Sequence, residues 1–175
     1  MIILLEGPDK AGKSSLAKML SGRLEIPIKK HSHCQSAQEA FGCAKQVLYE
    51  YKKEPDRPTQ IWDRFYYPSD LIYGPIVAGY EIPDALRVLY STEIQQALSQ
   101  YNTLIIHCTA DPEILIERLK RDGDYYIEER HVREIVKGYR KFFETCLLPT
   151  VTIDSSEISV DEMVSQAINA ILRRI

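Results

Sequence analysis

The sequence predicts an α/β protein in which a parallel sheet carries helices on both faces. Short apolar runs alternate with longer amphipathic stretches along all 175 residues, the order expected when each strand is followed by a crossover helix. The first run, Met1–Leu5, is continuously apolar, as in a strand that helices bury on both faces. The length, the 45% hydrophobic content and the lack of repeats or linker-like segments predict one domain over residues 1–175.

Five β-prone runs are candidates for the sheet. A Pro-containing turn at Glu54–Pro58 precedes the third of them, and turn residues of this kind commonly bound a strand. The five runs are Met1–Leu5, Ile26–His31, Gln60–Asp63, Thr103–Thr109 and Thr150–Ile153. We therefore expect a five-stranded parallel sheet.

The stretches between these runs carry apolar residues at helical spacing. Leu16, Met19 and Leu20 share one face of a helix that we expect to end at Gly22. Pro75 and Gly79 are expected to break the chain between two further helices. The other predicted helices are Ala37–Lys53, Ser69–Tyr73, Pro83–Tyr101, Pro112–Arg121, His131–Cys146 and Val160–Leu172.

Charge and cysteine content exclude several classes of protein. The net charge of −3 argues against a basic surface for nucleic acid or anionic membrane. No apolar run approaches the ~20 residues of a membrane span, and the apolar start is too short for a signal peptide. The four cysteines neither form C-x-x-C pairs nor reach the density of a disulfide scaffold. We expect a cytoplasmic protein with reduced thiols and a small-molecule substrate.

A glycine-rich loop follows the first predicted strand and precedes the first predicted helix. Residues 7–14, Gly-Pro-Asp-Lys-Ala-Gly-Lys-Ser, match G-x-x-x-x-G-K-[ST]. In such a loop, backbone N–H groups surround phosphate oxygens at a helix N-terminus, the lysine adds positive charge, and the hydroxyl ligates Mg²⁺. We expect ATP and Mg²⁺ to bind here, at Gly7, Pro8, Asp9, Lys10, Ala11, Gly12, Lys13, Ser14 and Ser15.

Two charged residues inside this loop are candidates for roles of their own. Lys10 is placed to stabilise charge on a transferring phosphate, and Asp9 to accept a hydrogen bond from a sugar hydroxyl. The alternative is that both are solvated charges on a turn.

A second polar cluster ends the third predicted strand, at Trp62-Asp63-Arg64-Phe65. Open α/β sheets bind ligands at the carboxyl ends of their strands. A carboxylate there can orient Mg²⁺-bound water or an acceptor oxygen, and a neighbouring arginine can fork onto a phosphate. Asp63 is therefore a metal and catalytic candidate and Arg64 a substrate-binding candidate. The alternative is an Asp–Arg pair that only ends a strand.

These motifs resemble the thymidylate kinases, a family of nucleoside monophosphate kinases. Leu5–Ser15 is similar to the family's E-G-x-D-x-x-G-K-[ST]-[ST] opening, and Asp63-Arg64-Phe65 to its D-R-[YFH] motif. Thr109–Glu113 and Glu117–Gly123 are similar to its D-P-E…E-R…R segment, and Ile153–Ser156 to its terminal I-D-[AG]-[ST] turn. The resemblance covers most of the chain and implies a P-loop kinase fold with an Arg-bearing lid at about 118–129.

The resemblance also implies catalytic roles. Lys13 and Ser14 would bind ATP and Mg²⁺, Asp63 would orient the metal or the acceptor, and basic groups would surround the transferring phosphoryl group. The catalytic candidates are Lys10, Lys13, Asp63, Arg118 and Arg121, and the metal candidates are Ser14 and Asp63.

Substrate-binding candidates follow from the family's spacing. Ser69 and Tyr73 keep the positions of a serine and an aromatic residue after the D-R pair, where Arg64 would hold the acceptor's phosphate. Phe41 and Lys45 keep the spacing of a base-stacking Phe and a base-contacting Arg. Lys in place of that Arg, and one extra residue after the D-R pair, indicate a divergent member such as a viral one.

The predicted function is ATP- and Mg²⁺-dependent phosphoryl transfer to a deoxynucleoside monophosphate of the dTMP type. One alternative is a deoxynucleoside kinase, although that family typically has E-R-S where this chain has Asp63-Arg64-Phe65. A second alternative is a P-loop protein that holds nucleotide without turnover. The segments 69–73 and 83–101 could form a homodimer face, as in the resembled family.

Three histidine-rich or aromatic runs are explained without a ligand. His31-Ser-His33-Cys34 contains zinc-ligand types but lacks a fourth ligand at suitable spacing. Tyr125-Tyr126 could stack on a base, but packing at the core edge is the simpler explanation. Tyr139 and Phe142-Phe143 lie at helical spacing and are expected in the core.

Overall fold

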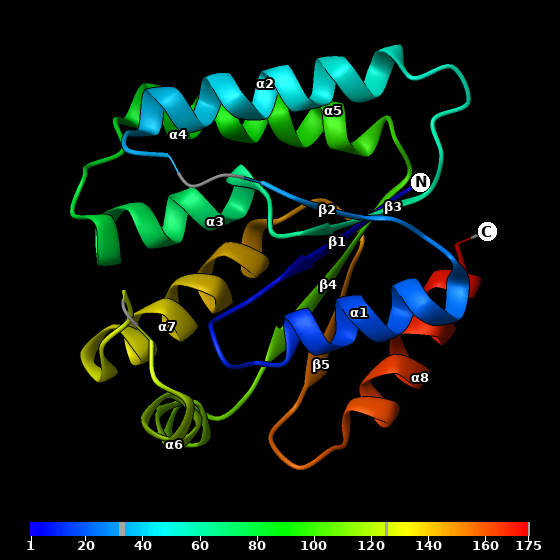
Figure 1. Ribbon diagram of the computed structural model, residues 1–175. Coiled ribbons are helices and arrows are strands. Elements are labelled where there is room, and N and C mark those ends of the chain that lie inside the picture. Colours follow the sequence, from blue (N-terminus) through cyan, green and yellow to red (C-terminus); the bar gives the residue numbers. More distant parts are fainter. Residues whose placement is uncertain (32–33, 125, 175) are drawn as a thin grey trace.

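The computed structural model of the protein describes residues 1–31, 34–124 and 126–174. At its centre lies a parallel sheet with the strand order β2-β3-β1-β4-β5 (Figure 1). The strands are β1 (Ile2–Glu6), β2 (Ile28–Lys30), β3 (Gln60–Asp63), β4 (Thr103–Thr109) and β5 (Thr150–Asp154). The predicted α/β class and five-stranded parallel sheet are thus confirmed.

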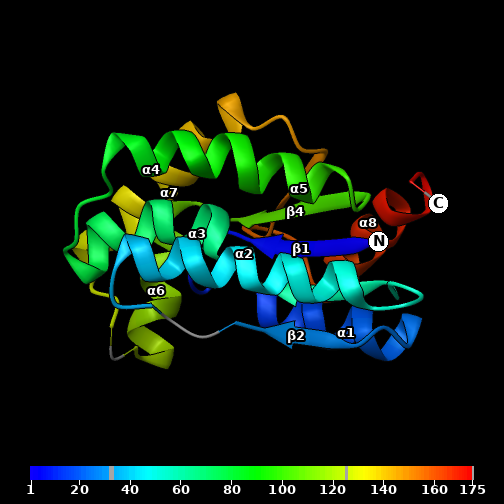
Figure 2. The same ribbon diagram turned by 90° about the horizontal axis from the view of Figure 1, so that it is seen from above.

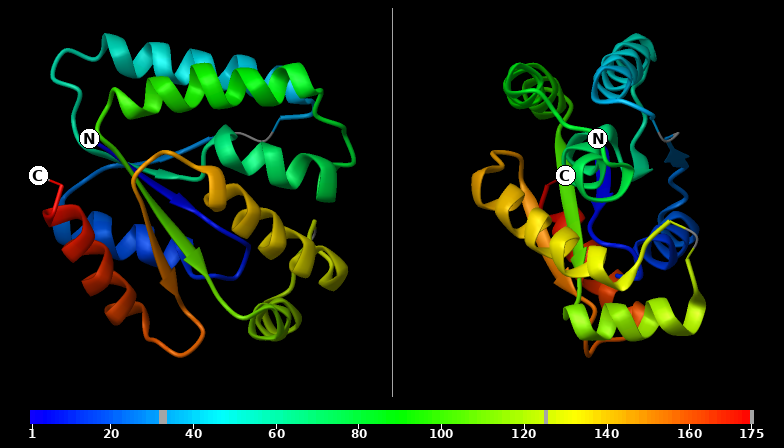
Figure 3. Two further views of the ribbon diagram at one scale, coloured as in Figure 1. Left: turned by 180° about the vertical axis from the view of Figure 1, so that it is seen from behind. Right: turned by 90° about the vertical axis from the view of Figure 1, so that its left-hand side faces the viewer.

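Helices cover both faces of this sheet (Figure 2). They are α1 (Lys13–Leu24), α2 (Ala37–Lys53), α3 (Tyr66–Tyr73), α4 (Asp84–Leu89), α5 (Gln95–Ser99), α6 (Pro112–Asp122), α7 (Glu129–Thr145) and α8 (Val160–Leu172). Two π-helical turns accompany them: Gly74–Ala78 continues α3, and Tyr90–Ile94 joins α4 to α5. α3, α6 and α7 gather beyond the carboxyl end of β4 (Figure 3).

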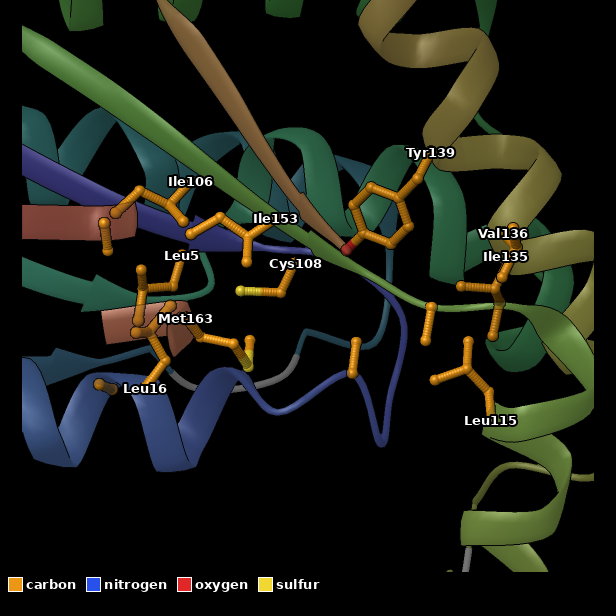
Figure 4. Packing of buried hydrophobic residues seen from close by; sticks show 14 of the residues in the cluster. Leu5, Leu16, Ile106, Cys108, Leu115, Ile135, Val136, Tyr139, Ile153 and Met163 are labelled. Atoms are coloured by element: carbon orange, nitrogen blue, oxygen red, sulfur yellow. The ribbon is translucent and has the colours of Figure 1, made fainter. Parts of the chain in front are cut away.

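Alternate residues of β1 enter two separate cores. Ile3 and Leu5 pack in the cluster that α1 and α8 cover, whereas Ile2 and Leu4 pack in the cluster that α2 covers. Figure 4 shows Leu5 beside Leu16 and other members of the first cluster. Because β1 is buried on both faces, packing holds its carboxyl end, and therefore the first residue of the following loop, in place.

The sequence predicted that the first helix ends at Gly22, and this prediction is wrong. α1 continues to Leu24, and the left-handed residue that ends it is Glu25, with φ 55°. Glycine inside a helix costs only about 1 kcal/mol relative to alanine, and continuation packs Leu24 against the core. Pro27 then follows within the extended segment that leads to β2.

The break between α3 and α4 lies at Gly79 and not at Pro75. The chain stays helical through Pro75 in a widened π turn, and Gly79 ends the turn with φ 73°. Proline has no N–H to donate, and it stands at the start of this turn, where its lack of a donor is tolerated. By contrast, α2, β3, β4 and α8 have the predicted bounds.

Other expectations concern the core and the membrane. Tyr139 is fully buried, and Phe142 and Phe143 pack partly buried against the same core, as predicted. Within the described ranges, no helix combines the length and the apolarity that a membrane span requires. His33 of the histidine-rich run and Tyr125 of the tyrosine pair lie outside the described residues.

Candidate functional site

A cleft of about 1070 Å³ opens at the carboxyl edge of the sheet. The loops that follow β1, β3 and β5 contribute to its lining, as do α3 and the end of α6. Of the residues predicted as functional, Asp9, Lys10, Gly12, Lys13, Ser14, Ser15, Asp63, Arg64, Ser69, Tyr73, Arg118 and Arg121 line it. Segments far apart in the sequence thus converge at the edge where ligands bind in open α/β sheets.

The loop 7–15, hereafter the phosphate loop, has a backbone shape that requires glycine. Gly7 has φ 137°, and a Cβ there would lie 1.9 Å from the carbonyl oxygen of Cys108. Gly12 has φ 86° and precedes the first turn of α1. Pro8 and Ala11 of the loop are buried. This geometry holds the N-terminus of α1 toward the cleft, where backbone N–H groups favour an anion.

Lys13 is the one buried lysine among the described residues, with 6% of its surface exposed. Its Nζ donates a hydrogen bond to the carbonyl oxygen of Pro8 at 2.6 Å. Burial, together with the positive charge of Arg64, lowers the pKa of Lys13 to about 8. A phosphate in the loop would supply the anionic partner that a buried ammonium group lacks.

Ser14 and Asp63 meet at the mouth of the cleft, where Ser14 Oγ donates to Asp63 Oδ2 at 3.5 Å. Lys30 Nζ lies 3.8 Å from the same carboxylate oxygen. Within the described ranges, no three His, Cys, Asp or Glu side chains group to hold a metal. One hydroxyl and one carboxylate nevertheless fit Mg²⁺, which usually binds few protein oxygens and completes its shell with phosphate and water.

Arg64 is the centre of a hydrogen-bonded set of side chains that we term the arginine cluster: Glu6, Asp9, Arg64, Ser69, Tyr73 and Tyr139. Its Nη2 donates to Asp9 Oδ1 at 2.7 Å and to the Tyr73 hydroxyl at 2.9 Å. Its Nη1 donates to the Tyr139 hydroxyl at 3.1 Å and to Ser69 Oγ at 3.4 Å. Arg64 itself has φ 67°, a left-handed backbone conformation that non-glycine residues adopt uncommonly.

The pKa values of the two carboxyl groups in the cluster, Asp9 and Glu6, are shifted in opposite directions. Burial would raise the pKa of Asp9, but Arg64, Lys13 and a 2.8 Å hydrogen bond from Tyr73 outweigh it and lower the pKa. Glu6 is fully buried, and burial raises its pKa although Arg64 and several hydrogen bonds oppose the shift. The guanidinium therefore has its firmest anionic partner in Asp9.

Glu6 and Tyr139 are members of the cluster to which no function was predicted from the sequence. Glu6 accepts hydrogen bonds from the Phe65 N–H at 2.8 Å, from Ser69 Oγ at 2.9 Å and from the Tyr139 hydroxyl at 2.9 Å. An acidic residue that ends an apolar strand was a usable signal for Glu6. No local signal marks Tyr139, whose ring occupies an ordinary core position of α7.

Lys10 of the phosphate loop and the two predicted lid arginines, Arg118 and Arg121, have different partners. Lys10 Nζ donates to the carbonyl oxygen of Gly123 at 2.8 Å, so it joins the phosphate loop to the segment after α6. Arg118 donates to the carbonyl oxygens of Lys10 and Ser155 and to Ser155 Oγ, at 2.7–3.1 Å. Arg121 is exposed and pairs with Asp122 at 2.7 Å. Arg118 thus braces two loops, whereas Arg121 bonds only the neighbouring Asp122 on the surface.

Phe41 and Lys45, predicted to contact the base, are not brought together with the other candidates. The Phe41 ring packs edge-on against Tyr90, 5.2 Å between centroids, and Lys45 pairs with Glu93 at 3.0 Å. Neither Phe41 nor Lys45 is among the described residues that line the cleft. Their spacing on α2 matches the family pattern, but the local packing directs both toward the helix around Tyr90.

Comparison with known proteins agrees with this architecture. No protein-family model matches the sequence. The chain is 21% identical to the thymidylate kinase of Malacoplasma penetrans (strain HF-2) over 214 residues, covering 100% of this chain and 97% of that protein. Deoxyadenosine kinase from M. mycoides with bound dATP superposes with a TM-score of 0.72 and 18% identity, covering 98% and 100% of the two chains. The fold is that of the P-loop kinases.

Similarity to one bacterial prophage protein is higher. The SPbeta prophage-derived uncharacterized protein YorR of Bacillus subtilis (strain 168) is 31% identical over 168 residues, which cover 95% of this chain and 96% of YorR. The crystal structure of Bacillus subtilis YorR in complex with phosphorylated GDP matches with a TM-score of 0.76 and 28% identity, over 98% and 96% of the chains. The chain therefore belongs to the family of the prophage protein YorR.

Proposed function

We propose that the protein is a kinase that transfers the terminal phosphoryl group of ATP, with Mg²⁺, to a deoxynucleoside monophosphate such as dTMP. The observation that carries this proposal is the sharing of one cleft by the phosphate loop, with its buried Lys13, and by the arginine cluster. One of these sites suits the phosphates of a donor and the other suits the sugar and phosphate of an acceptor. The weak similarity to a thymidylate kinase over the full chain is consistent with this acceptor.

On the donor side, catalysis would depend on position and charge rather than on covalent chemistry. Lys13 would exchange its bond to Pro8 for the outer phosphates of ATP. Ser14 and Asp63 would hold Mg²⁺, which when bound neutralises charge on the phosphates. Lys10 and Arg121, which line the cleft, would compensate charge on the transferring group, and each would first exchange its present partner, the Gly123 carbonyl or Asp122.

On the acceptor side, Asp9 and Arg64 would orient the substrate. The carboxylate of Asp9, ionised because its pKa is lowered, can accept from a sugar hydroxyl. Arg64, held by Tyr73, Tyr139 and Ser69, would contact the acceptor's phosphate with charge-assisted hydrogen bonds. We propose that residues 118–129 act as a lid of a single kinase domain, which limits hydrolysis of ATP by excluding water.

Phosphorylation of a deoxynucleoside is the second candidate function, and one observation favours it. Both terminal nitrogens of Arg64 already donate to protein groups, two each. A monophosphate would have to displace some of these partners, whereas a nucleoside hydroxyl would need only Asp9 or Asp63. The fold similarity to a deoxyadenosine kinase supports the same alternative.

A panel of ATP-consumption assays tests the proposal, with deoxynucleosides and their 5′-monophosphates as paired acceptors. The expected result is faster turnover with the monophosphate of each pair. Faster turnover with the nucleosides would assign the protein as a deoxynucleoside kinase. ATP binding without consumption for any acceptor would indicate a non-catalytic nucleotide-binding protein. The homodimer and the cytoplasmic location stay predictions that these assays do not address.

A further inference from the structure

Glu6 is the last residue of β1 and directly precedes the phosphate loop, but none of its surface is exposed. It is not among the described residues that line the cleft, and it has no part in the roles proposed above. Burial of a carboxylate is costly even where partners compensate it, and an apolar residue would end β1 without that cost. Any contribution of Glu6 to the reaction must therefore pass through residues that do line the cleft.

Both oxygens of the Glu6 carboxylate accept hydrogen bonds. Oε1 accepts from the Phe65 N–H at 2.8 Å, and Oε2 accepts from Ser69 Oγ and from the Tyr139 hydroxyl at 2.9 Å each. A hydroxyl group has one proton to donate and two lone pairs that accept. Because Ser69 and Tyr139 each give that proton to Glu6, they face Arg64 only as acceptors.

Arg64 needs acceptors at this position, because a guanidinium group only donates hydrogen bonds. Its Nη1 donates to the Tyr139 hydroxyl at 3.1 Å and to Ser69 Oγ at 3.4 Å. Without Glu6, these two hydroxyl groups, whose oxygens are 3.3 Å apart, could bond each other instead. The Glu6 carboxylate thus determines that both hydroxyl groups accept from the guanidinium.

The backbone of Arg64 is held by the same end of β1. Its N–H donates to the carbonyl oxygen of Leu5 at 3.0 Å, and the next N–H, that of Phe65, donates to Glu6. These bonds fix the peptide groups on both sides of Arg64, whose φ of 67° non-glycine residues adopt uncommonly. Arg64 Nη2 also donates to Asp9 of the phosphate loop at 2.7 Å. The end of β1 and the loop that follows it therefore determine where the guanidinium lies.

We infer that Glu6 is a positioning residue, which aligns Arg64, and through Arg64 the acceptor's phosphate, with the phosphate loop that holds the donor. The inference rests on the proposed function in that Arg64 contacts the acceptor's phosphate. A misplacement of about 1 Å between reacting groups can cost about 10²-fold in rate. Because Arg64 itself stays present and charged, loss of the Glu6 carboxylate should lower kcat more than it raises KM.

Glu6→Gln is the matched variant, because it keeps the shape of the side chain and replaces one accepting oxygen with a donating nitrogen. In either orientation of the amide, at least one of the three donors then faces an N–H group. We expect kcat with dTMP to fall about 10–100-fold, and KM for dTMP and for ATP to change less than about threefold. Gln60→Glu is the control, since it changes a buried residue at the opposite end of the sheet. It should lower the melting temperature and leave kcat unchanged.

A double-mutant cycle shows whether Glu6 acts through Arg64. In an Arg64→Ala background, Glu6→Gln should lower kcat by less than about threefold, because the residue that it positions is already absent. Losses that multiply in the double variant would overturn the inference. A kcat for Glu6→Gln within about threefold of wild type, or an equal loss of kcat in Gln60→Glu, would overturn it as well.

Crystal structures of the wild type and of Glu6→Gln, both without substrates, separate the inference from the proposed function. We expect the Arg64 guanidinium to lose at least one of its hydroxyl partners in the variant. If it does, but Arg64→Ala leaves the kinetics of the acceptor unchanged or no acceptor is phosphorylated, only the proposed function fails. An Arg64 side chain that keeps all its partners in the variant would overturn the inference. If Glu6→Gln does not fold, Glu6→Asp, whose carboxylate is one methylene shorter, decides by the same measurements.

Discussion

The phosphate loop and the arginine cluster face the same cleft but are built differently. The loop is one continuous segment, and its shape depends on backbone conformation, with Gly7 against the Cys108 carbonyl and Gly12 at the start of α1. The cluster takes side chains from five places: the end of β1, the phosphate loop itself, the residue after β3, α3 and α7. Glu6 and Tyr139, which share a 2.9 Å hydrogen bond, are 133 positions apart in the sequence.

The two regions also differ in how their charges are satisfied. Lys13 is buried without an ion-pair partner among the described residues and bonds only a carbonyl oxygen. Arg64 has an ionised carboxylate and three hydroxyl groups around it. The charge of Lys13 therefore has no anionic side chain bonded to it among the described residues, whereas the charge of Arg64 is met by side chains of the cluster. We therefore expect substitutions in the phosphate loop to change activity alone, and substitutions in the arginine cluster to change both activity and stability.

The largest effect is expected from Lys13→Ala. Loss of the charge that acts on the transferring phosphate should lower kcat by about 10²–10³ or more, while circular dichroism shows a retained fold. The measurement is kcat at saturating ATP. Lys18→Ala, on the same helix but exposed, serves as the control and should keep full activity. Wild-type kcat in Lys13→Ala would contradict the kinase assignment itself.

Lys10→Ala and Arg121→Ala test whether the charge around the transferring group comes from the loop or from the lid. Removal of one transition-state donor typically costs about 10²–10³ in kcat. Because Lys10 also bonds Gly123, its loss should affect lid closure and kcat together, whereas Arg121 should affect kcat alone. If both variants stay within about threefold of wild-type kcat, neither residue is a major donor.

The difference between the two regions also explains what could be predicted from sequence. The phosphate loop, the strands and helices such as α2 and α8 follow from contiguous patterns: a glycine motif, apolar runs and helical spacing. Asp9 and Arg64 were predicted from their places in the loop and after the third strand, and Ser69 and Tyr73 from a spacing shared with a known family. All four do lie together.

Tertiary packing accounts for what was missed. Tyr139 has the sequence signature of a core residue, and its ring is indeed in the core; only its hydroxyl enters the cluster. Phe41 and Lys45 have the expected spacing, but spacing on α2 does not determine which neighbour they contact, and Tyr90 and Glu93 are those neighbours. The helix did not end at Gly22 because the core contact of Leu24 outweighs a small local cost.

Arg64→Ala should have an intermediate effect and should distinguish the two candidate acceptors. If the acceptor is a monophosphate, loss of charge-assisted hydrogen bonds should raise its KM about 10–100-fold and lower kcat, with far less change in KM for ATP. Arg64→Lys should restore activity only in part, because a point charge does not replace a planar fork. Kinetics with dCMP and dTMP beside their nucleosides provide the readout. Faster wild-type turnover of the nucleosides would identify a deoxynucleoside kinase.

The smallest effect is expected from Tyr139→Phe, which removes one hydroxyl from the arginine cluster. Glu6 would lose a donor and Arg64 an acceptor, and each buried group left with one partner fewer costs about 1–3 kcal/mol. Because Ser69 and Tyr73 still hold Arg64, we expect kcat/KM for the acceptor to fall only about three- to tenfold.

Loss of stability alone would not show that this hydroxyl matters to the site, so a second buried tyrosine is needed for comparison. Tyr51 is equally buried, and its hydroxyl bonds the carbonyl oxygen of Pro58 at 3.3 Å, outside the cleft. Tyr51→Phe, like Tyr139→Phe, should lower the melting temperature by a few degrees, but it should leave kcat/KM unchanged. Equal activity in the two variants would mean that Tyr139 stabilises the fold but does not orient the Arg64 side chain. A loss confined to Tyr139→Phe, and larger for the acceptor than for ATP, would make Tyr139 a positioning residue that no contiguous motif reveals.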